Sequence, residues 1–274
     1  MFARYEGVAW EERFLPRLTS RQIREMPKAD ALVILPIGAV EQHGPHLPVM
    51  TDALIGEATL TLALERLPAD APVWLLPPIA YGKSNEHLGL PGTVSISAAT
   101  LQGLVTDIAA SLKLSGFGKL LLFNTHGGNV DLLNVVSREI RIAHDMTVFY
   151  LSPSSLGAAD GVIDPHELEY GIHGGDYETS IVMAIKPQWV QGQWLASELP
   201  NIGDKRFLTL EGGIRFAWRM ADISESGICG DATKATAAKG EIIQERVADI
   251  LAEAFAELCA FDVADVRGAS KVSP

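Results

Sequence analysis

The sequence of 274 residues has few cysteines, no long apolar run and no excess of positive charge. Its two cysteines, Cys229 and Cys259, form no CxxC pair, which excludes a disulfide framework and a thiolate zinc site. No segment approaches the roughly 20 apolar residues of a membrane span, and the first residues lack the apolar core of a signal peptide. The balance of 34 acidic and 22 basic residues gives a net charge of −12, which argues against a nucleic-acid or membrane surface. We therefore expect a cytoplasmic protein whose metal ligands would be nitrogen and oxygen atoms.

Short apolar runs alternate with helical patterns along most of the chain. Buried parallel strands are predicted over 31–38, 73–82, 119–127 and 147–153. Helices are predicted over 52–67, 97–117, 129–145 and 236–261. The segment 154–235, with many Gly and Pro residues, is interpreted as an excursion that lines a site or an oligomer interface. This order predicts one domain over residues 1–274, a three-layer α/β/α, Rossmann-like fold with a mostly parallel sheet.

Polar motifs stand where the predicted strands end. The motif "EQHGPH" follows the first strand, "GKSNEHLGLPGT" the second and "NTHGGN" the third, and "HGGDYETS" opens a further helix. Ligands of open α/β sheets bind beyond the carboxyl ends of the strands, where such loops meet. We therefore expect the four motifs to form one site.

Five side chains in these motifs have the chemistry of a dinuclear metal centre. Glu41 and His43 are two residues apart, so in an extended backbone they point to the same side. Asp52 begins a predicted helix, His126 ends the third strand, and Glu178 lies in the first turn of a helix. Two carboxylates, two imidazoles and a shared aspartate would hold two divalent ions about 3.5–4 Å apart, with a bridging water as the nucleophile.

Each residue also has an ordinary alternative. Asp52 could cap its helix, Glu178 could interact with a helix dipole, and His126 could make only a loop hydrogen bond. In the "SNEH" loop, Glu86 and His87 are candidate substrate contacts. A dinucleotide-binding oxidoreductase would need GxGxxG after the first strand, which "PIGAVEQHG" does not supply. The joint occurrence of the ligands at successive strand ends favours the metal centre.

The motifs "PIGAVEQHGPHLPVMTD", "GKSNEHLGLPGTVS", "NTHGGN", "HGGDYETS" and "GICGDATKATAAKG" resemble, in this order, signatures of the creatininase (creatinine amidohydrolase) family. The resemblance implies a dinuclear centre of zinc, manganese or iron, with zinc favoured, and a homohexamer built as a trimer of dimers. It implies hydrolysis of a C–N bond in a small amide, cyclic amide or formamide. The family also includes a maturation peptidase, so a peptidase-like enzyme is an alternative, as is a degenerate member that only binds a metal or ligand.

The resemblance also assigns roles to residues of the metal centre. Glu41 and His126 would bind one ion, His43 would bind the other, and Asp52 would bridge them. Gly128 stands where creatininase has a glutamate ligand, and Glu178 is predicted to replace that glutamate.

The same resemblance predicts residues that act on the substrate. His173 matches the histidine that protonates the leaving nitrogen, and Ser84 matches a serine that contacts the substrate. Residues that line the creatinine pocket of creatininase correspond here to Glu169, Tyr170 and Ile172. Glu169 and Tyr170 are therefore predicted to contact an amide other than creatinine.

Overall fold

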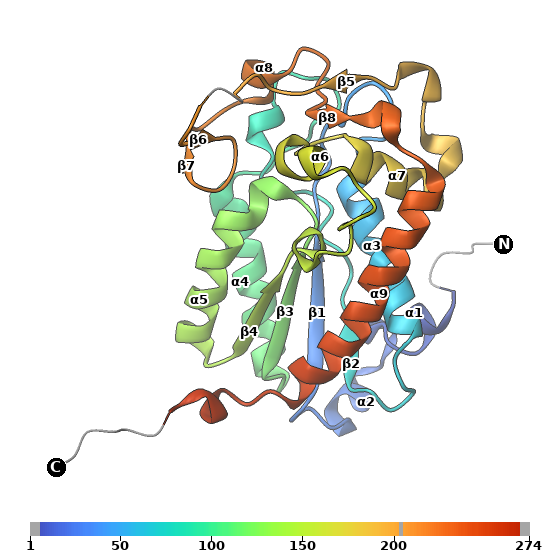
Figure 1. Ribbon diagram of the computed structural model, residues 1–274. Coiled ribbons are helices and arrows are strands. Elements are labelled where there is room, and N and C mark those ends of the chain that lie inside the picture. Colours follow the sequence, from blue (N-terminus) through green and yellow to red (C-terminus); the bar gives the residue numbers. More distant parts are fainter. Residues whose placement is uncertain (1–5, 203–204, 269–274) are drawn as a thin grey trace.

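The computed structural model describes residues 6–202 and 205–268, and its centre is a sheet of four parallel strands (Figure 1). The strands are β1 (Leu32–Ile37), β2 (Val73–Leu75), β3 (Lys119–Asn124) and β4 (Thr147–Leu151), in the order β2-β1-β3-β4. The predicted parallel α/β/α fold is confirmed. Strand β2 ends well before residue 82, because Pro77 and Pro78 follow it and proline has no backbone N–H to pair.

The helices are α1 (Val8–Glu11), α2 (Ser20–Glu25), α3 (Thr51–Glu65), α4 (Ala98–Leu114), α5 (Val130–His144), α6 (Pro165–Tyr170), α7 (Asp176–Ile185), α8 (Met220–Ile223) and α9 (Ala237–Ala260). The four predicted helices correspond to α3, α4, α5 and α9 within a few residues. Ser97 and Thr236 start α4 and α9, since each side chain accepts a hydrogen bond from a backbone N–H of the first turn.

The sheet is covered on both faces, which explains why its strands are apolar throughout. On one face, Ile34 of β1 and Leu121 of β3 pack against α3 and α9. On the other face, Val33 and Leu122 from the same strands pack against α4 and α5. Figure 1 shows the two pairs of helices on opposite sides of the sheet.

The excursion lies over the carboxyl edge of the sheet (Figure 1). It contains α6, α7, α8 and four short strands, β5 (Ser197–Glu198), β6 (Leu208–Thr209), β7 (Ile214–Arg215) and β8 (Gly230–Asp231). Helix α7 packs along α9 and α3, which joins the excursion to the body of the fold. Among the described residues, no helix is both long and apolar enough to cross a membrane.

Candidate metal centre

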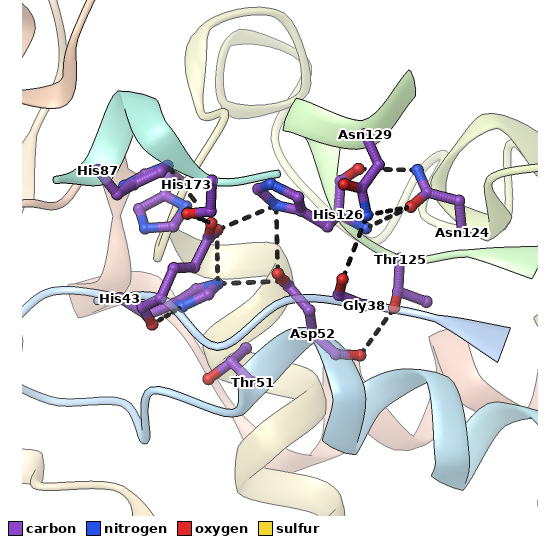
Figure 2. Close-up of polar contacts among 12 residues, drawn as sticks. Gly38, His43, Thr51, Asp52, His87, Asn124, Thr125, His126, Asn129 and His173 are labelled. Atoms are coloured by element: carbon purple, nitrogen blue, oxygen red, sulfur yellow. Dashed lines mark hydrogen bonds and ion pairs between the residues drawn. The ribbon is translucent and has the colours of Figure 1, made fainter. Parts of the chain in front are cut away.

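The five predicted metal ligands converge beyond the carboxyl ends of β1 and β3. His43 Nε2 lies 3.2 Å from Asp52 Oδ1 and 3.7 Å from Glu178 Oε1. On the other side of Asp52, His126 Nδ1 lies 3.2 Å from Glu41 Oε1 and 3.3 Å from Asp52 Oδ2. Figure 2 shows His43 and His126 both pointing toward Asp52. Two ligand trios therefore share Asp52: Glu41, Asp52 and His126, and His43, Asp52 and Glu178.

The fold positions these side chains from several separate segments. Glu41 and His43 follow β1, and Asp52 lies in the first turn of α3, where no side chain caps the helix. The Asp52 carboxylate is therefore free to face the cluster, and Thr125 Oγ1 donates to the Asp52 carbonyl at 2.8 Å. Glu178 lies in the first turn of α7, where the Gly174 N–H donates to its Oε2 at 2.6 Å.

Backbone carbonyls orient the two imidazoles. His43 Nδ1 lies 3.0 Å from the Glu41 carbonyl, and His126 Nε2 lies 3.1 Å from the Lys83 carbonyl. Because a carbonyl only accepts, each of these ring nitrogens carries hydrogen. The opposite nitrogen of each ring faces the cluster, which is how histidines that bind metals are usually held.

Two buried atoms of the cluster, His43 Nε2 and Asp52 Oδ2, make no hydrogen bond with the described residues. Both atoms lie close to charged groups, but these close contacts do not have the geometry of hydrogen bonds. Burying such atoms without partners costs free energy, as does bringing three carboxylates together. Nitrogen and oxygen donors of this kind suit divalent zinc or manganese, so the residues present fit a dinuclear metal site.

The charges of the cluster shift the pKa values of its members. Burial alone would lower the pKa of His43, but Asp52 and Glu178 raise it well above its usual value. Burial would likewise lower the pKa of His126, and Glu41 and Asp52 raise it. Burial would raise the pKa of Asp52, but His43 and His126 lower it. Protonated imidazoles thus balance the carboxylates in the metal-free chain.

The structure also brings four predicted substrate or catalytic residues to the cluster. His173 Nδ1 lies 3.7 Å from Glu41 Oε1, and His87 Nε2 lies 3.8 Å from the same oxygen. The buried Ser84 hydroxyl donates to Glu41 Oε2, so it contacts a predicted ligand rather than open space. Glu86 pairs with Lys83 at 2.8 Å, and its Oε1 lies 3.6 Å from His126 Nε2.

Gly128 leaves the space that Glu86 fills. A Cβ atom on residue 128 would lie 1.9 Å from Glu86 Oε1 and 2.5 Å from His126 Nε2. No side chain fits there unless these groups move. The site therefore has a carboxylate beside Gly128, but it comes from a different loop.

Asn124 and Asn129, which fix the site, are not predicted from the sequence. Asn124 and Asn129 hold the "NTHGGN" turn: Asn129 Nδ2 donates to Asn124 Oδ1 and to the Gly38 carbonyl, both at 3.2 Å (Figure 2). His46 Nε2 lies 2.9 Å from Thr179 Oγ1, and burial lowers the pKa of His46 to about 4. Neutral His46 thus ties the first motif to α7. The two asparagines are partners within the motif, but the Gly38 carbonyl that Asn129 also contacts lies 91 residues away in the sequence.

The predicted substrate contacts Glu169 and Tyr170 are not brought to the cluster. Glu169 is exposed on α6, and the Tyr170 ring lies against His166 with ring centroids 4.8 Å apart. The buried residue of this helix is Glu167, whose carboxylate accepts from the backbone N–H of Asp176 at 2.8 Å and of Asp231 at 2.9 Å. Glu167 thereby joins the start of α7 to β8.

Replacing Glu167 with alanine should lower the free energy of unfolding by about 2–3 kcal/mol, because buried N–H groups would lose a charged acceptor. Urea unfolding would measure the change. Glu169→Ala is the matched control, since Glu169 lies on the same helix and is exposed. Its effect should stay within about 0.5 kcal/mol, the usual range for surface positions. Equal effects of the two substitutions would contradict the role of Glu167.

Two adjoining cavities open on the cluster. The first has a volume of about 480 Å³ and is lined by Glu41, Asp52, His87 and His126. Two positively charged residues, Lys83 and Arg215, also line it. The second, of about 520 Å³, extends toward apolar and hydroxyl side chains, among them Ile55, Leu168, Tyr150 and Ser152. The two cavities share six residues: Gly127, Val130, Ile172, His173, Glu178 and Glu211.

The parallel α/β/α sheet and the ligand cluster at its carboxyl edge define the class of protein, an α/β/α fold with a site that could hold divalent metal. The chain belongs to the creatininase family, because the family model described as creatinine amidohydrolase matches residues 16–255. This confirms the resemblance seen in the motifs.

Individual relatives agree with the family. The chain is 37% identical over 227 residues to the mycofactocin precursor peptide peptidase of Mycolicibacterium smegmatis, covering 82% of this chain and 83% of that protein. It is 31% identical over 261 residues to the creatinine amidohydrolase of Pseudomonas putida, covering 89% and 96%. A solved creatininase structure matches with a TM-score of 0.68 and 30% identity over 90% of this chain and 98% of that one. The chain is therefore a hydrolase that acts on C–N bonds.

Proposed function

We propose that the protein is a metal-dependent amidohydrolase that uses two divalent ions per chain. One ion would be held by Glu41, Asp52 and His126, and the other by His43, Asp52 and Glu178. The observation that supports this most directly is the pair of trios that share Asp52 and contain buried atoms without hydrogen-bond partners. Solved creatininases include a manganese form and a zinc–zinc form, so we propose zinc, with manganese or iron as alternatives.

Bound ions would supply Lewis acidity toward an amide carbonyl and would lower the pKa of water. His173 is placed to move the proton. Its Nε2 lies 2.6 Å from the Gln42 carbonyl and therefore carries hydrogen, while its Nδ1 faces the cluster. Burial and the nearby His43 lower the pKa of His173 in the metal-free chain, which favours a neutral ring there. His173 Nδ1 would accept the proton of the attacking water and then transfer it to the leaving nitrogen.

The shape of the cleft favours an amide larger than creatinine. Pockets for drug-sized ligands have volumes of about 300–1,000 Å³, and each of the two joined cavities already falls in that range. Peptide cleavage is therefore a second candidate function. It is supported by the volumes of the two adjoining cavities and by the 37% identity to the mycofactocin precursor peptide peptidase.

The experiment that tests the proposal is an assay of the purified, metal-analysed protein against lactams, cyclic ureides, formamides and short peptides. Metal-dependent hydrolysis of any of these amides would support an amidohydrolase. A protein that binds metal but turns over none of them would favour the degenerate, ligand-binding alternative.

Creatinine should be a poor substrate, with kcat/KM below about 10⁴ M⁻¹s⁻¹, the lower end of ordinary enzyme efficiency. A small planar ring needs matched polar contacts, and each missing partner costs about 1–3 kcal/mol. Steady-state creatinine hydrolysis would measure this, with the best amide of the panel as the positive control. Creatinine turnover above that threshold would contradict the prediction.

Metal binding at pH 7 should release protons, up to about two per chain, because ligand histidines must be deprotonated. The pKa values of His43 and His126 are raised in the metal-free chain, so both rings are protonated there. Apparent metal affinity should therefore rise with pH until both rings are neutral without metal. Calorimetric titrations in two buffers of different ionisation enthalpy would count the protons. Metal binding without proton release would contradict the assignment of these rings as ligands.

We further propose, from the family resemblance, a cytoplasmic homohexamer built as a trimer of dimers. Light scattering of the metal-loaded protein would test the assembly. A monomer under all metal conditions would contradict it.

A further inference from the structure

Gln42, between the two ligands of the first motif, is buried with only 5% of its surface exposed, and its amide can be oriented in only one way. The Gly44 N–H donates to Gln42 Oε1 at 2.9 Å, and Gln42 Nε2 donates to the Gly227 carbonyl at 3.0 Å. A backbone N–H only donates and a carbonyl only accepts, so the oxygen and nitrogen of the amide are unambiguous. One hydrogen of Nε2 is left for another partner.

Two histidine nitrogens lie within reach of that hydrogen. His173 Nε2 is 3.2 Å from Gln42 Nε2, but it already donates to the Gln42 carbonyl at 2.6 Å. Two donors cannot form a hydrogen bond with each other. The remaining hydrogen therefore goes to His87 Nδ1, at 3.0 Å.

This bond fixes the tautomer of His87. Because Nδ1 accepts, it carries no hydrogen, and the ring is a neutral imidazole with its hydrogen on Nε2. Only 3% of His87 is exposed, and the ring lines the first cavity. Its Nε2 has no acceptor within hydrogen-bond distance among the described residues, and Glu41 Oε1 lies 3.8 Å away. A donor is thus held at the cavity without a partner.

We propose that His87 is a catalytic hydrogen-bond donor whose Nε2–H binds the carbonyl oxygen of the substrate as it becomes an oxyanion, and that Gln42 is the positioning residue that fixes its tautomer. This rests on the proposed amide hydrolysis. His87 keeps its proton throughout, so no proton transfer is involved. A fixed donor aimed at developing charge stabilises the transition state more than the ground state.

The alternative target of this N–H is the Glu41 carboxylate. A separation of 3.8 Å is too long for a hydrogen bond, and Glu41 Oε2 already accepts from Ser84. A substrate oxygen placed beside Glu41 would lie within reach of His87 Nε2. The geometry therefore favours the substrate over Glu41.

Two substitutions at His87 separate the donor from the rest of the ring. His87→Leu should lower kcat by roughly 10²–10³-fold, the usual loss for one oxyanion-stabilising donor, with KM and metal content little changed. His87→Gln should retain most of kcat, because the glutamine Nε2 can replace the imidazole N–H. His166→Leu, at an exposed histidine, should match the wild type. Unchanged kcat in His87→Leu, or equal losses of activity and metal in both His87 variants, would overturn the proposal.

The tautomer can be tested without any activity. In ¹⁵N spectra of the zinc-loaded protein, His87 Nδ1 should show the shift of an unprotonated nitrogen, and Nε2 that of a protonated one. Gln42→Glu replaces the donor with an acceptor, so it should put a proton on Nδ1 and lower kcat while zinc stays bound. A protonated His87 Nδ1 in the wild type would overturn the proposal. If the wild type hydrolyses no amide, the proposed function and the oxyanion role both fail, while the spectra still decide the tautomer.

Discussion

Replacing Asp52 with asparagine should remove metal from both sites and lower kcat/KM by roughly 10³-fold or more, since bound metal contributes several kcal/mol of transition-state stabilisation. Asp52 is the one residue common to both ligand trios, and its two carboxylate oxygens face His43 and His126 separately. A neutral amide can offer only one oxygen and bridges two cations poorly. Metal analysis after gel filtration, together with kinetics on the best amide substrate, would measure both effects.

Asp107→Asn is the matched control, because Asp107 is exposed on α4, on the outer face of the fold. It should keep the metal content and activity of the wild type. Full occupancy of both sites in Asp52→Asn would show that the carboxylate is not a shared bridge. Loss of only one ion would assign Asp52 to a single site.

His173→Ala should keep its metal and lose turnover by roughly 10²–10⁴-fold, the usual contribution of a positioned acid or base. The Nε2–H of His173 is held by the Gln42 carbonyl, so Nδ1 is the nitrogen available for proton transfer. Most of the loss should fall on kcat, because the ring acts on the reacting atoms rather than on substrate affinity. Single-turnover kinetics and metal analysis of the same preparation would measure it.

The geometry makes the metal analysis decisive. His173, Glu41 and His43 together form a third group of side chains that could hold an ion. Loss of metal in His173→Ala would therefore show that His173 is a ligand rather than the proton carrier. His144→Ala, near the carboxyl end of α5, is the control and should leave metal and turnover unchanged.

The sheet and the ligand cluster could be predicted because their signals are local. A run such as "ALVILPIG" is apolar at every position, which indicates a strand covered on both faces. His126 directly follows such a run, and parallel strands bring their carboxyl ends to one edge. Strand ends alone therefore predicted that Glu41, His43 and His126 would meet.

The supporting contacts could not be predicted because they join segments that are far apart in sequence. Gln42 contacts His173 and Gly227, and the Glu167 carboxylate accepts a hydrogen bond from the Asp231 N–H. None of these contacts produces a recognisable pattern in the local sequence. Only the family resemblance predicts Glu169 and Tyr170 at the site. The half-turn of helix between Glu167 and Glu169 decides which carboxylate faces inward, and no periodicity in so short a helix reveals that choice.

The packing of Glu86 against Gly128 makes these two positions interdependent under mutation. A side chain at 128 is blocked by Glu86, while loss of Glu86 alone leaves Lys83 without its ion pair and removes the carboxylate that lies 3.6 Å from His126 Nε2. A lineage that exchanges one arrangement of acidic groups for the other would therefore have to change both loops.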